Sequence, residues 1–446
     1  MDASTAQGLR IAVVGSGISG LSAAWLLARR HDVTLFEQAD RLGGHSNTVV
    51  VGRGADRIAV DTGFIVFNPE TYPNLVALFA HLDVATCETE MSFAVSRHHG
   101  RFEYAGTNLS SLFAQPHNLL RPGFWSMLRD LRRFYATCVD DLEQLDARPE
   151  SLGAYLVRHG YGIRFRDDHL LPMAAAIWSA SPDAMLDYPA AAFIRFFENH
   201  GLLKLRGRPR WHTVVDGSTQ YVRKLTEPLE GRIRKGAKIV NITRDAHGGV
   251  LKLSDGTTSG FDHIVLAAHA DEALDLLNDA TEHERRLLGA FRYTHNRAFL
   301  HTDTSLMPAR RAVWSSWNFV ERDRAFVTYW MNRLQPIASQ MPLFVTLNPS
   351  PLPAAGSVLD AEDYAHPIFD DRALAAQRDL WSLQGARHTW FCGSYFGAGF
   401  HEDGLQAGLA VAEDLGGVRR PWCVSNDSGR IARGPLPASV DLMTAS

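Results

Sequence analysis

The chain has 446 residues, 46% of them hydrophobic and 21% charged, which is enough for two or three globular domains. Its formal net charge of −4 gives no reason to expect nucleic acid as a partner. Four widely separated cysteines without a CxxC pair predict reduced thiols in the cytoplasm and no metal site. Glycines interrupt the apolar N-terminal stretch, and no run of about eighteen apolar residues follows, so neither a signal peptide nor a spanning helix is expected.

The first elements expected along the chain are a buried parallel strand over residues 11–14, a glycine turn and a helix. The turn fits the pattern GxGxxG and consists of Gly15, Ser16, Gly17, Ile18, Ser19 and Gly20. Its first glycine permits the tight turn, the second lets a pyrophosphate approach the backbone, and the third lets the helix pack against the strand. The amides at the start of that helix favour an anion, so the turn predicts dinucleotide binding.

A second strand, over residues 32–36, ends at Glu37. A carboxylate in this place accepts hydrogen bonds from the ribose hydroxyls and repels a 2′-phosphate, which disfavours NADP. With its neighbour Gln38 it completes the first group of predicted cofactor contacts. This part of the sequence leaves the choice between NAD and FAD open.

Arg41, Gly43, Gly44 and His45 follow the second strand at once. Paired glycines let the chain pass close to a bulky ligand, and an arginine can pair with a phosphate. The segment resembles the RxGG[RK] motif of the flavin amine oxidase and phytoene desaturase superfamily, in which Arg or Lys usually stands where this chain has His45. That resemblance implies FAD as the resident cofactor.

Near the end of the chain, a strand over residues 390–392, a glycine-rich loop and a helix resemble the terminal flavin motif of the same superfamily. The resemblance places Gly393 and Ser394 beside the pyrophosphate and the ribityl chain, with Ser394 in place of the usual acidic residue. It also implies backbone amides that face the N1–C2=O edge of the flavin, where a helix dipole stabilises the anionic reduced ring. The residues that would carry these amides are Gly404, Leu405 and Gln406.

The middle of the chain, residues 236–277, is typical of a strand, a hairpin, two strands and a helix, with Gly-Gly and Asp-Gly at the turns. In the superfamily the first of these strands passes the adenine, which implies backbone contacts from Ile239 or Val240. The small residues Ala267 and Ala268 end the last strand and leave room for the cofactor.

Together these segments predict an α/β fold: a discontinuous Rossmann-type FAD-binding domain with an inserted α+β substrate domain, similar to the amine oxidases. The FAD-binding domain is expected to comprise residues 1–80, 207–272 and 386–417, the substrate domain residues 81–206 and 273–385, and a flexible tail residues 418–446. The patterns predict a mostly helical first insertion and an antiparallel sheet over the flavin from the second.

The candidate catalytic residue is His401, which the resemblance places over the flavin as a base, a hydrogen-bond donor or a neutral wall. Glu402 and Asp403 either hold the ribityl chain or cap the helix. The family's flavin-facing lysine falls near Asn296 and Arg297, and its absence here argues against ordinary amine oxidation.

Aromatic residues of the insertions either line a pocket or belong to the core, and the examples are Trp178, Tyr329 and Trp330, together with Asn332. The stretch 121–134 combines Trp, Leu and Phe with arginines. It is either a helix that rests on an anionic membrane or an ordinary surface helix.

The favoured function is an FAD-dependent oxidoreductase that abstracts a hydride from a small hydrophobic substrate. Relatives are often encoded beside fatty-acyl-modifying methyltransferases, and this association implies desaturation of a fatty acyl chain, free or within a phospholipid. The alternatives are a flavin amine oxidase, a non-redox flavin-dependent isomerase, a flavin-binding regulatory protein and a plain NAD dehydrogenase.

Overall fold

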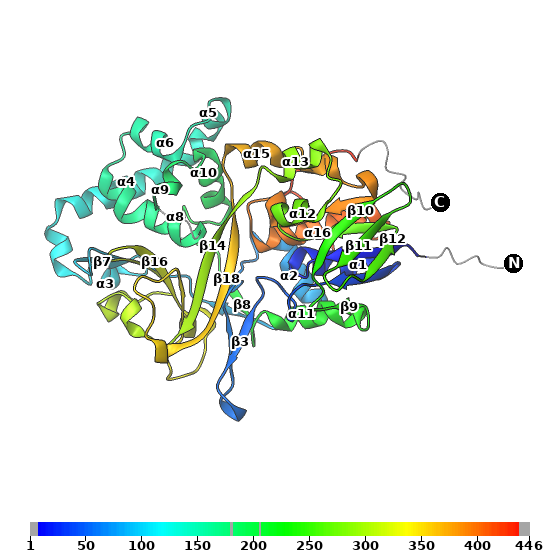
Figure 1. The fold of residues 1–446 in the computed structure, drawn as a ribbon. Helices are drawn as coiled ribbons and strands as arrows, with labels where there is room; N and C mark the ends of the chain where they lie inside the picture. The colour runs from blue at the N-terminus through cyan, green and yellow to red at the C-terminus, as the bar shows by residue number, and fades with distance from the viewer. Residues whose placement is uncertain (1–7, 179–181, 205–206, 437–446) are drawn as a thin grey trace.

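The computed structural model describes residues 8–178, 182–204 and 207–436, and it comprises a nucleotide-binding half and a half built by the two insertions (Figure 1). The centre of the first half is a parallel sheet in the order β19-β13-β1-β2-β9. Its strands are β1 (Arg10–Val14), β2 (Asp32–Phe36), β9 (Ile233–Arg234), β13 (His263–Leu266) and β19 (Thr389–Phe391). Segments far apart in the sequence therefore share one sheet, which confirms the predicted α/β fold.

The helix α1 (Ile18–Leu27) packs against this sheet and against α16 (His401–Gly416). All ten residues of α1 are buried. The two helices approach closely because a glycine lies at their contact: a Cβ on Gly408 would stand 2.2 Å from the carbonyl oxygen of Ser19. An antiparallel sheet of β10 (Ile239–Arg244), β11 (Gly249–Leu253) and β12 (Thr258–Phe261) belongs to the same half. Its other helices are α11 (Thr219–Thr226), α12 (Ala270–Leu276), α13 (Glu282–Leu288) and α15 (Asp371–Gln377).

The second half contains a sheet of seven strands in the order β18-β14-β17-β16-β15-β6-β7. Its long pair β14–β18 runs between the helices of the first insertion and the nucleotide-binding half (Figure 1). The pairing is antiparallel except between β15 and β6, where the two insertions meet in parallel. The strands are β6 (Phe93–Arg97), β7 (Phe102–Ala105), β14 (Arg292–His301), β15 (Trp317–Glu321), β16 (Ala325–Trp330), β17 (Phe344–Leu347) and β18 (Val358–Ile368).

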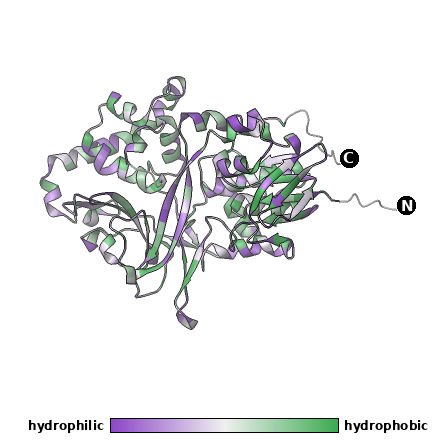
Figure 2. Ribbon diagram, viewed as in Figure 1, coloured by the Kyte–Doolittle hydropathy of each residue, from purple (hydrophilic) through white to green (hydrophobic). Residues whose placement is uncertain are grey.

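The first insertion is mostly helical, as predicted, and its helices enclose an apolar core of their own. Hydrophobic and hydrophilic residues alternate along these helices in Figure 2, which is the periodic pattern that predicted them. Within the described ranges, no helix is long and apolar enough to cross a membrane. The helices are α3 (Leu109–Leu112), α4 (Pro122–Thr137), α5 (Leu142–Ala147), α6 (Leu152–Arg158), α7 (Ile163–Phe165), α8 (Leu171–Trp178), α9 (Pro182–Leu186) and α10 (Ala190–Asn199).

Smaller elements join the two halves. The helix α2 (Pro73–His81) contacts α16, and α14 (Met331–Leu334) follows β16. Two antiparallel strand pairs complete the structure: β3 (Thr48–Val51) with β4 (Ile58–Asp61), and β5 (Thr86–Thr89) with β8 (Trp211–Val214). The domain boundaries stay a prediction, but residues 282–291 and 369–383 of the expected substrate domain place apolar side chains in the core of the nucleotide-binding half.

The segment 418–436 differs from the flexible tail expected from its composition. The ring of Trp422 stacks on that of Trp25 with centroids 6.0 Å apart, and Ile431 is 6% exposed within the core. The guanidinium of Arg420 is buried and donates from Nε to Oε1 of Glu413 at 2.8 Å. The sequence did not predict these apolar and ionic contacts, because their residues stand among Pro, Gly and Ser. The remainder of the expected tail, 437–446, lies outside the described residues.

We predict that Arg420→Met lowers the free energy of unfolding by about 3–5 kcal/mol, because it leaves the buried carboxylate of Glu413 without its cation. Arg419→Met is the matched control, since Arg419 is 82% exposed and stands 3.6 Å from the same carboxylate. It should cost less than about 1 kcal/mol. Urea unfolding measures both, and equal losses would contradict a structural role for residue 420.

Candidate functional site

The glycine turn after β1 has two crowded glycines and one open one. Gly15 has a φ of +102°, and a Cβ there would lie 2.7 Å from the carbonyl oxygen of Ala267. A Cβ on Gly20 would lie 1.9 Å from the Gly15 oxygen. In contrast, a Cβ on Gly17 would meet no described atom within 4 Å, and no described side chain caps α1 there. The open position lies at the N-terminus of α1, where amides and dipole favour an anion.

The acidic residue after β2 holds this turn in place. Oε2 of Glu37 accepts hydrogen bonds from the Ser16 amide at 2.9 Å and from the Ser16 hydroxyl at 2.6 Å. The carbonyl of Glu37 accepts from the amide of Ala237 at 2.9 Å, which brings the segment before β10 to the end of β2. There Ile239 is buried, whereas Val240 is 45% exposed, and Gln38 is exposed as well. The sequence-predicted contacts thus lie around one edge of the sheet.

The second glycine pair lies against the first turn. The amide of Gly43 donates to the carbonyl of Ser16 at 3.0 Å, and a Cβ on Gly44 would lie 3.1 Å from Cα of Gly17. Arg41 donates from Nη1 to the Gly44 carbonyl at 2.6 Å and from Nη2 to Oε1 of Glu362 at 2.5 Å. The sequence predicted that Arg41 pairs with a phosphate. In the structure its guanidinium pairs with a carboxylate of β18.

The C-terminal motif meets the glycine turn from the other side. A Cβ on Gly404 would lie 3.0 Å from Cγ2 of Ile18 and 3.6 Å from the amide nitrogen of Ser394, the residue after Gly393. The helix α16 begins at His401, so the amide of Gly404 donates within the helix to the carbonyl of Phe400 at 3.1 Å.

This helix start corrects the predicted amide donors. Leu405 and Gln406 lie beyond Gly404, where helix amides bond to carbonyls four residues back. The amides without a helical partner belong to His401 and Glu402. Phe400, which precedes the helix, is not a usual N-cap residue, so no capping signal in the sequence marks this start.

The two acidic residues of this first turn have structural partners. Both oxygens of Glu402 cap α2, since they accept from the amides of Asn74 and Leu75 at 3.0 Å each. Asp403 accepts from the amide of Phe400 at 2.7 Å and from Nε of Arg430 at 2.5 Å. Burial raises the pKa of both carboxyls. Asp403 thus caps its own helix, as one alternative predicted, whereas Glu402 caps α2 instead, and Arg430 lay in the segment expected to be a tail.

His401 lies at the point where α16 meets the loops of the N-terminal part. Its Nε2 is 2.7 Å from the hydroxyl of Tyr221 and 3.3 Å from that of Ser46. Its ring stacks on Phe64 at 3.8 Å between centroids, with 8° between the planes. Burial lowers its pKa to about 3, so the imidazole is neutral at physiological pH.

Three further histidines gather where β18 passes the glycine pair. The ring centroid of His45 lies 5.3 Å from that of His366 and 6.4 Å from that of His269. Nδ2 of Asn296 donates to Nδ1 of His366 at 2.9 Å. Burial lowers the pKa of His45 well below its usual value and that of His366 to about 4. In the described part of the chain, no group of three or more His, Cys, Asp or Glu could hold a metal ion.

The aromatic candidates of the insertions form contacts typical of packing. The ring centroid of Trp178 lies 4.6 Å from that of Phe196. The centroid of Phe196 lies 4.7 Å from that of Phe400, the residue before α16. The hydroxyl of Tyr329 donates to the carbonyl of Ala176 at 3.3 Å. Trp330 packs edge-on against Trp314, and Asn332 donates to the carbonyl of Met341.

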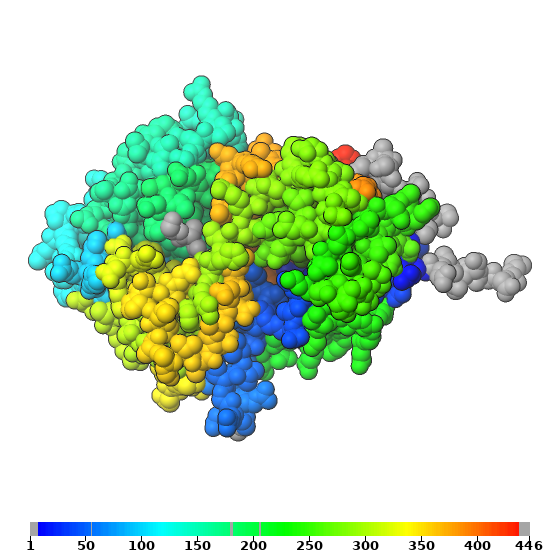
Figure 3. Space-filling view, viewed as in Figure 1, coloured from blue at the N-terminus to red at the C-terminus, as the bar shows by residue number. Residues whose placement is uncertain are grey.

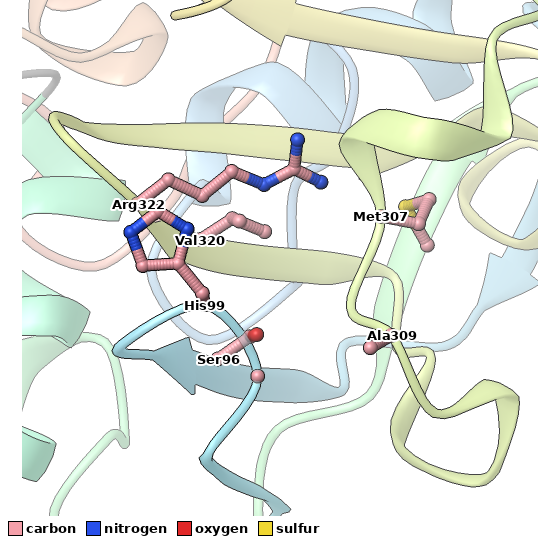
Figure 4. A pocket seen from close by; sticks show the side chains of 7 residues that line it. Ser96, His99, Met307, Ala309, Val320 and Arg322 are labelled. Atoms are coloured by element: carbon pink, nitrogen blue, oxygen red, sulfur yellow. The ribbon is translucent and has the colours of Figure 1, made fainter.

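A hollow of about 230 Å³ lies beside β6 and β15, two inner strands of the seven-stranded sheet (Figure 4). In the close-up, the side chains of His99 and Arg322 lie on one side of it and that of Met307 on the other. It shares no residue with the predicted site. Its lining consists of Ser96, His99, Gly100, Met307, Ala309, Val320 and Arg322.

Comparison with known proteins gives a concordant result. Residues 18–333 match the model of the family described as flavin containing amine oxidoreductase. The 15-cis-phytoene desaturase of Narcissus pseudonarcissus is 28% identical over 294 residues, which are 59% of this chain and 48% of that protein. The chain thus matches about half the length of this curated relative.

Two solved structures share the fold. A putrescine oxidase variant redesigned in cofactor binding superposes with a TM-score of 0.70 at 15% identity, over 92% of this chain and 98% of that one. A fatty acid isomerase from P. acnes that produces CLA superposes with a TM-score of 0.62 at 15% identity, over 91% and 98% of the two chains.

The residues present fit a flavin dinucleotide. The open position at Gly17 gives a pyrophosphate access to the start of α1, and Glu37 lies at the end of the next strand. The start of α16 lies beside the same turn through Gly404 and Ser394. A group that spans from one helix start to the other would therefore contact both terminal motifs.

We predict that Gly17→Ala lowers the affinity for FAD at least about tenfold, because its methyl group would occupy the space that the pyrophosphate needs. The folded protein should lose no more than about 1 kcal/mol, since the site is open and only an N-cap is changed. Gly106→Ala is the control, because a Cβ there also meets no described atom within 4 Å. Flavin titration measures the affinity, and wild-type binding by Gly17→Ala would contradict the placement.

We also predict that His366 makes the protein less stable in acid. Its folded pKa of about 4 lies below the unfolded value of 6.5, so its stabilising contribution is present above the unfolded value and is lost as the pH falls. From about pH 7.5 to about pH 5 the loss is roughly 2 kcal/mol. Urea unfolding of His366→Gln should show a shallower pH dependence than that of the wild type, while exposed His247→Gln should match the wild type.

Proposed function

The chain belongs to the family of flavin containing amine oxidoreductases, and from this premise we propose that it removes a hydride from a carbon atom of a hydrophobic substrate. Its cofactor is FAD. The favoured reaction is desaturation of a fatty acyl chain, in which one C–H bond gives a hydride, the adjacent carbon gives a proton, and a C=C bond forms. Bound FAD would supply the acceptor for that hydride.

The observation that carries this proposal is the polar group on β14 where a lysine was expected. Asn296 is 2% exposed, and it donates to His366 and accepts from Nδ2 of Asn348 at 2.7 Å. The sequence has five lysines, and residues 253–446 contain none. The strands β14 to β18, which the second insertion contributes to the seven-stranded sheet, all lie in this range. They therefore carry no lysine that could serve an amine oxidation.

The chain's own residues would bind the substrate through uncharged groups. His401 acts in this proposal as a neutral wall and hydrogen-bond partner, since its low pKa makes it a poor base. Neutral histidines supply no negative charge to offset the desolvation of an ammonium ion, which favours an uncharged substrate. Phe400 packs the start of α16 against the aromatic core of the first insertion, so apolar side chains surround this end of the helix.

We place the protein in the cytoplasm. Its substrate in this proposal is a small hydrophobic molecule that reaches the flavin, and nucleic acid is not a partner. The cysteines among the described residues are all free, as expected of a reducing compartment. The cofactor contacts proposed are those of the glycine turn, the Arg41–His45 segment and both terminal helices.

We predict that a long-chain acyl ester bleaches the visible flavin absorbance under anaerobic conditions, whereas an alkylamine of equal chain length does not. The reason is that the neutral histidines supply no negative charge to offset the desolvation of an ammonium ion. The rate should show no inflection near pH 6.5, because His401 and His366 are already neutral there. Stopped-flow absorbance measures both.

The same measurement separates the alternatives. Bleaching by the amine alone would show amine oxidation. Conversion of the ester without bleaching and without an electron acceptor would show a non-redox isomerase. A flavin that no ester and no amine reduces would contradict an oxidoreductase of either kind.

A further inference from the structure

The outer end of the first insertion exposes large apolar side chains from four neighbouring elements. They belong to α3, to the turn 116–120, to α4 and to α7. We call this surface the apolar tip. Its members and their exposed fractions are Leu109 75%, Leu119 47%, Leu120 85%, Trp125 49% and Ile163 63%. The segment around residues 110–130, cyan in Figures 1 and 3, forms the left edge of the molecule.

Contacts between the elements join these side chains into one surface. Nε1 of Trp125 donates to the carbonyl of Leu119 at 2.9 Å, and the ring of Phe113, directly after α3, lies 5.8 Å from that of Trp125. A Cβ built on Gly123 would lie 3.5 Å from the side chain of Arg164, which follows Ile163. The first turns of α4 and α7 are therefore adjacent.

The exposed charges of the segment 101–137, which forms most of the apolar tip, have one sign. The segment 101–137 contains two acidic residues, Glu103 and Asp130, which are 0% and 2% exposed. It also contains five arginines, and the side chain of Arg129 is 76% exposed. The segment thus presents positive charge on a chain whose formal net charge is −4. Its arginines are Arg101, Arg121, Arg129, Arg132 and Arg133.

We propose that the apolar tip docks on a membrane surface of anionic phospholipid. Leu and Trp side chains enter the boundary between headgroups and acyl chains, while arginines around them keep their guanidinium groups among the phosphates. Exposed apolar side chains that gather in one place mark an interaction site. A second copy of the chain is disfavoured as the partner, because an isologous contact would bring the two positive rims together.

This inference goes beyond the proposed function, since it rests on the surface and not on the reaction. It identifies where a hydrophobic substrate enters: from the bilayer, at the outer end of the same helical insertion whose aromatic core contacts Phe400. A water-soluble substrate would need no such surface.

Flotation of the FAD-loaded protein with vesicles tests the proposal. The wild type should bind vesicles of equal parts phosphatidylglycerol and phosphatidylcholine at least about tenfold more strongly than pure phosphatidylcholine, and high salt should weaken that preference. The double variant Leu120→Ser with Trp125→Ser should bind at least about tenfold less. Leu352→Ser, at a site 66% exposed outside the apolar tip, should bind like the wild type.

A charge variant gives an independent readout. Arg129→Gln should lower binding to the anionic vesicles alone, while Arg419→Gln, at a side chain 82% exposed outside the tip, should leave it unchanged. Flavin bleaching by a soluble substrate should be the same in all variants, so a failed oxidoreductase assay is distinguishable from a failed docking surface. Absent flotation of the wild type, or equal flotation of the double variant, would overturn the proposal. A dimer that the double variant abolishes, without flotation, would also overturn it.

Discussion

The close approach of α1 and α16 is the constraint on which the rest of the structure depends. It is possible because Gly408 lies against the backbone of Ser19, where a Cβ would collide, and Gly404 lies against the side chain of Ile18, which a Cβ would crowd. The consequence is that the starts of the two helices, one from each end of the chain, lie beside one turn. Neither motif would form a dinucleotide site alone, since each supplies only one group of amides.

Buried charge around the start of α16 follows from the same constraint. The carboxylates of Glu402 and Asp403 lie in the first turn, where the helix dipole favours them, but they would repel an anionic cofactor nearby. Arg430 offsets the charge of Asp403, and four donors from Asn74, Leu75 and Gln406 satisfy Glu402. These two carboxylates thus fix α2 and the C-terminal segment to α16. They leave the amides of His401 and Glu402 available to a ligand.

The parts that sequence predicted well are those in which short spacing determines backbone geometry. The order of glycines gave the strand, turn and helix at Gly15 to Gly20, because crowding at these positions follows from local spacing. Two pairings were missed: Arg41 with Glu362, 321 positions away, and Asp403 with Arg430, 27 positions away in the segment expected to be a tail. Such pairs leave no periodic signal. The histidines at 269 and 366 were missed for the same reason, since only the folded β18 brings them to His45.

The burial of α1 has a consequence for synthesis of the chain. All ten of its residues are buried, yet its partner α16 lies almost four hundred residues later. During translation this apolar helix is made well before α16, so it stays without that cover while the intervening chain is made. A site that needs the starts of both helices is therefore complete only after α16 has been made, and cofactor loading is a late event.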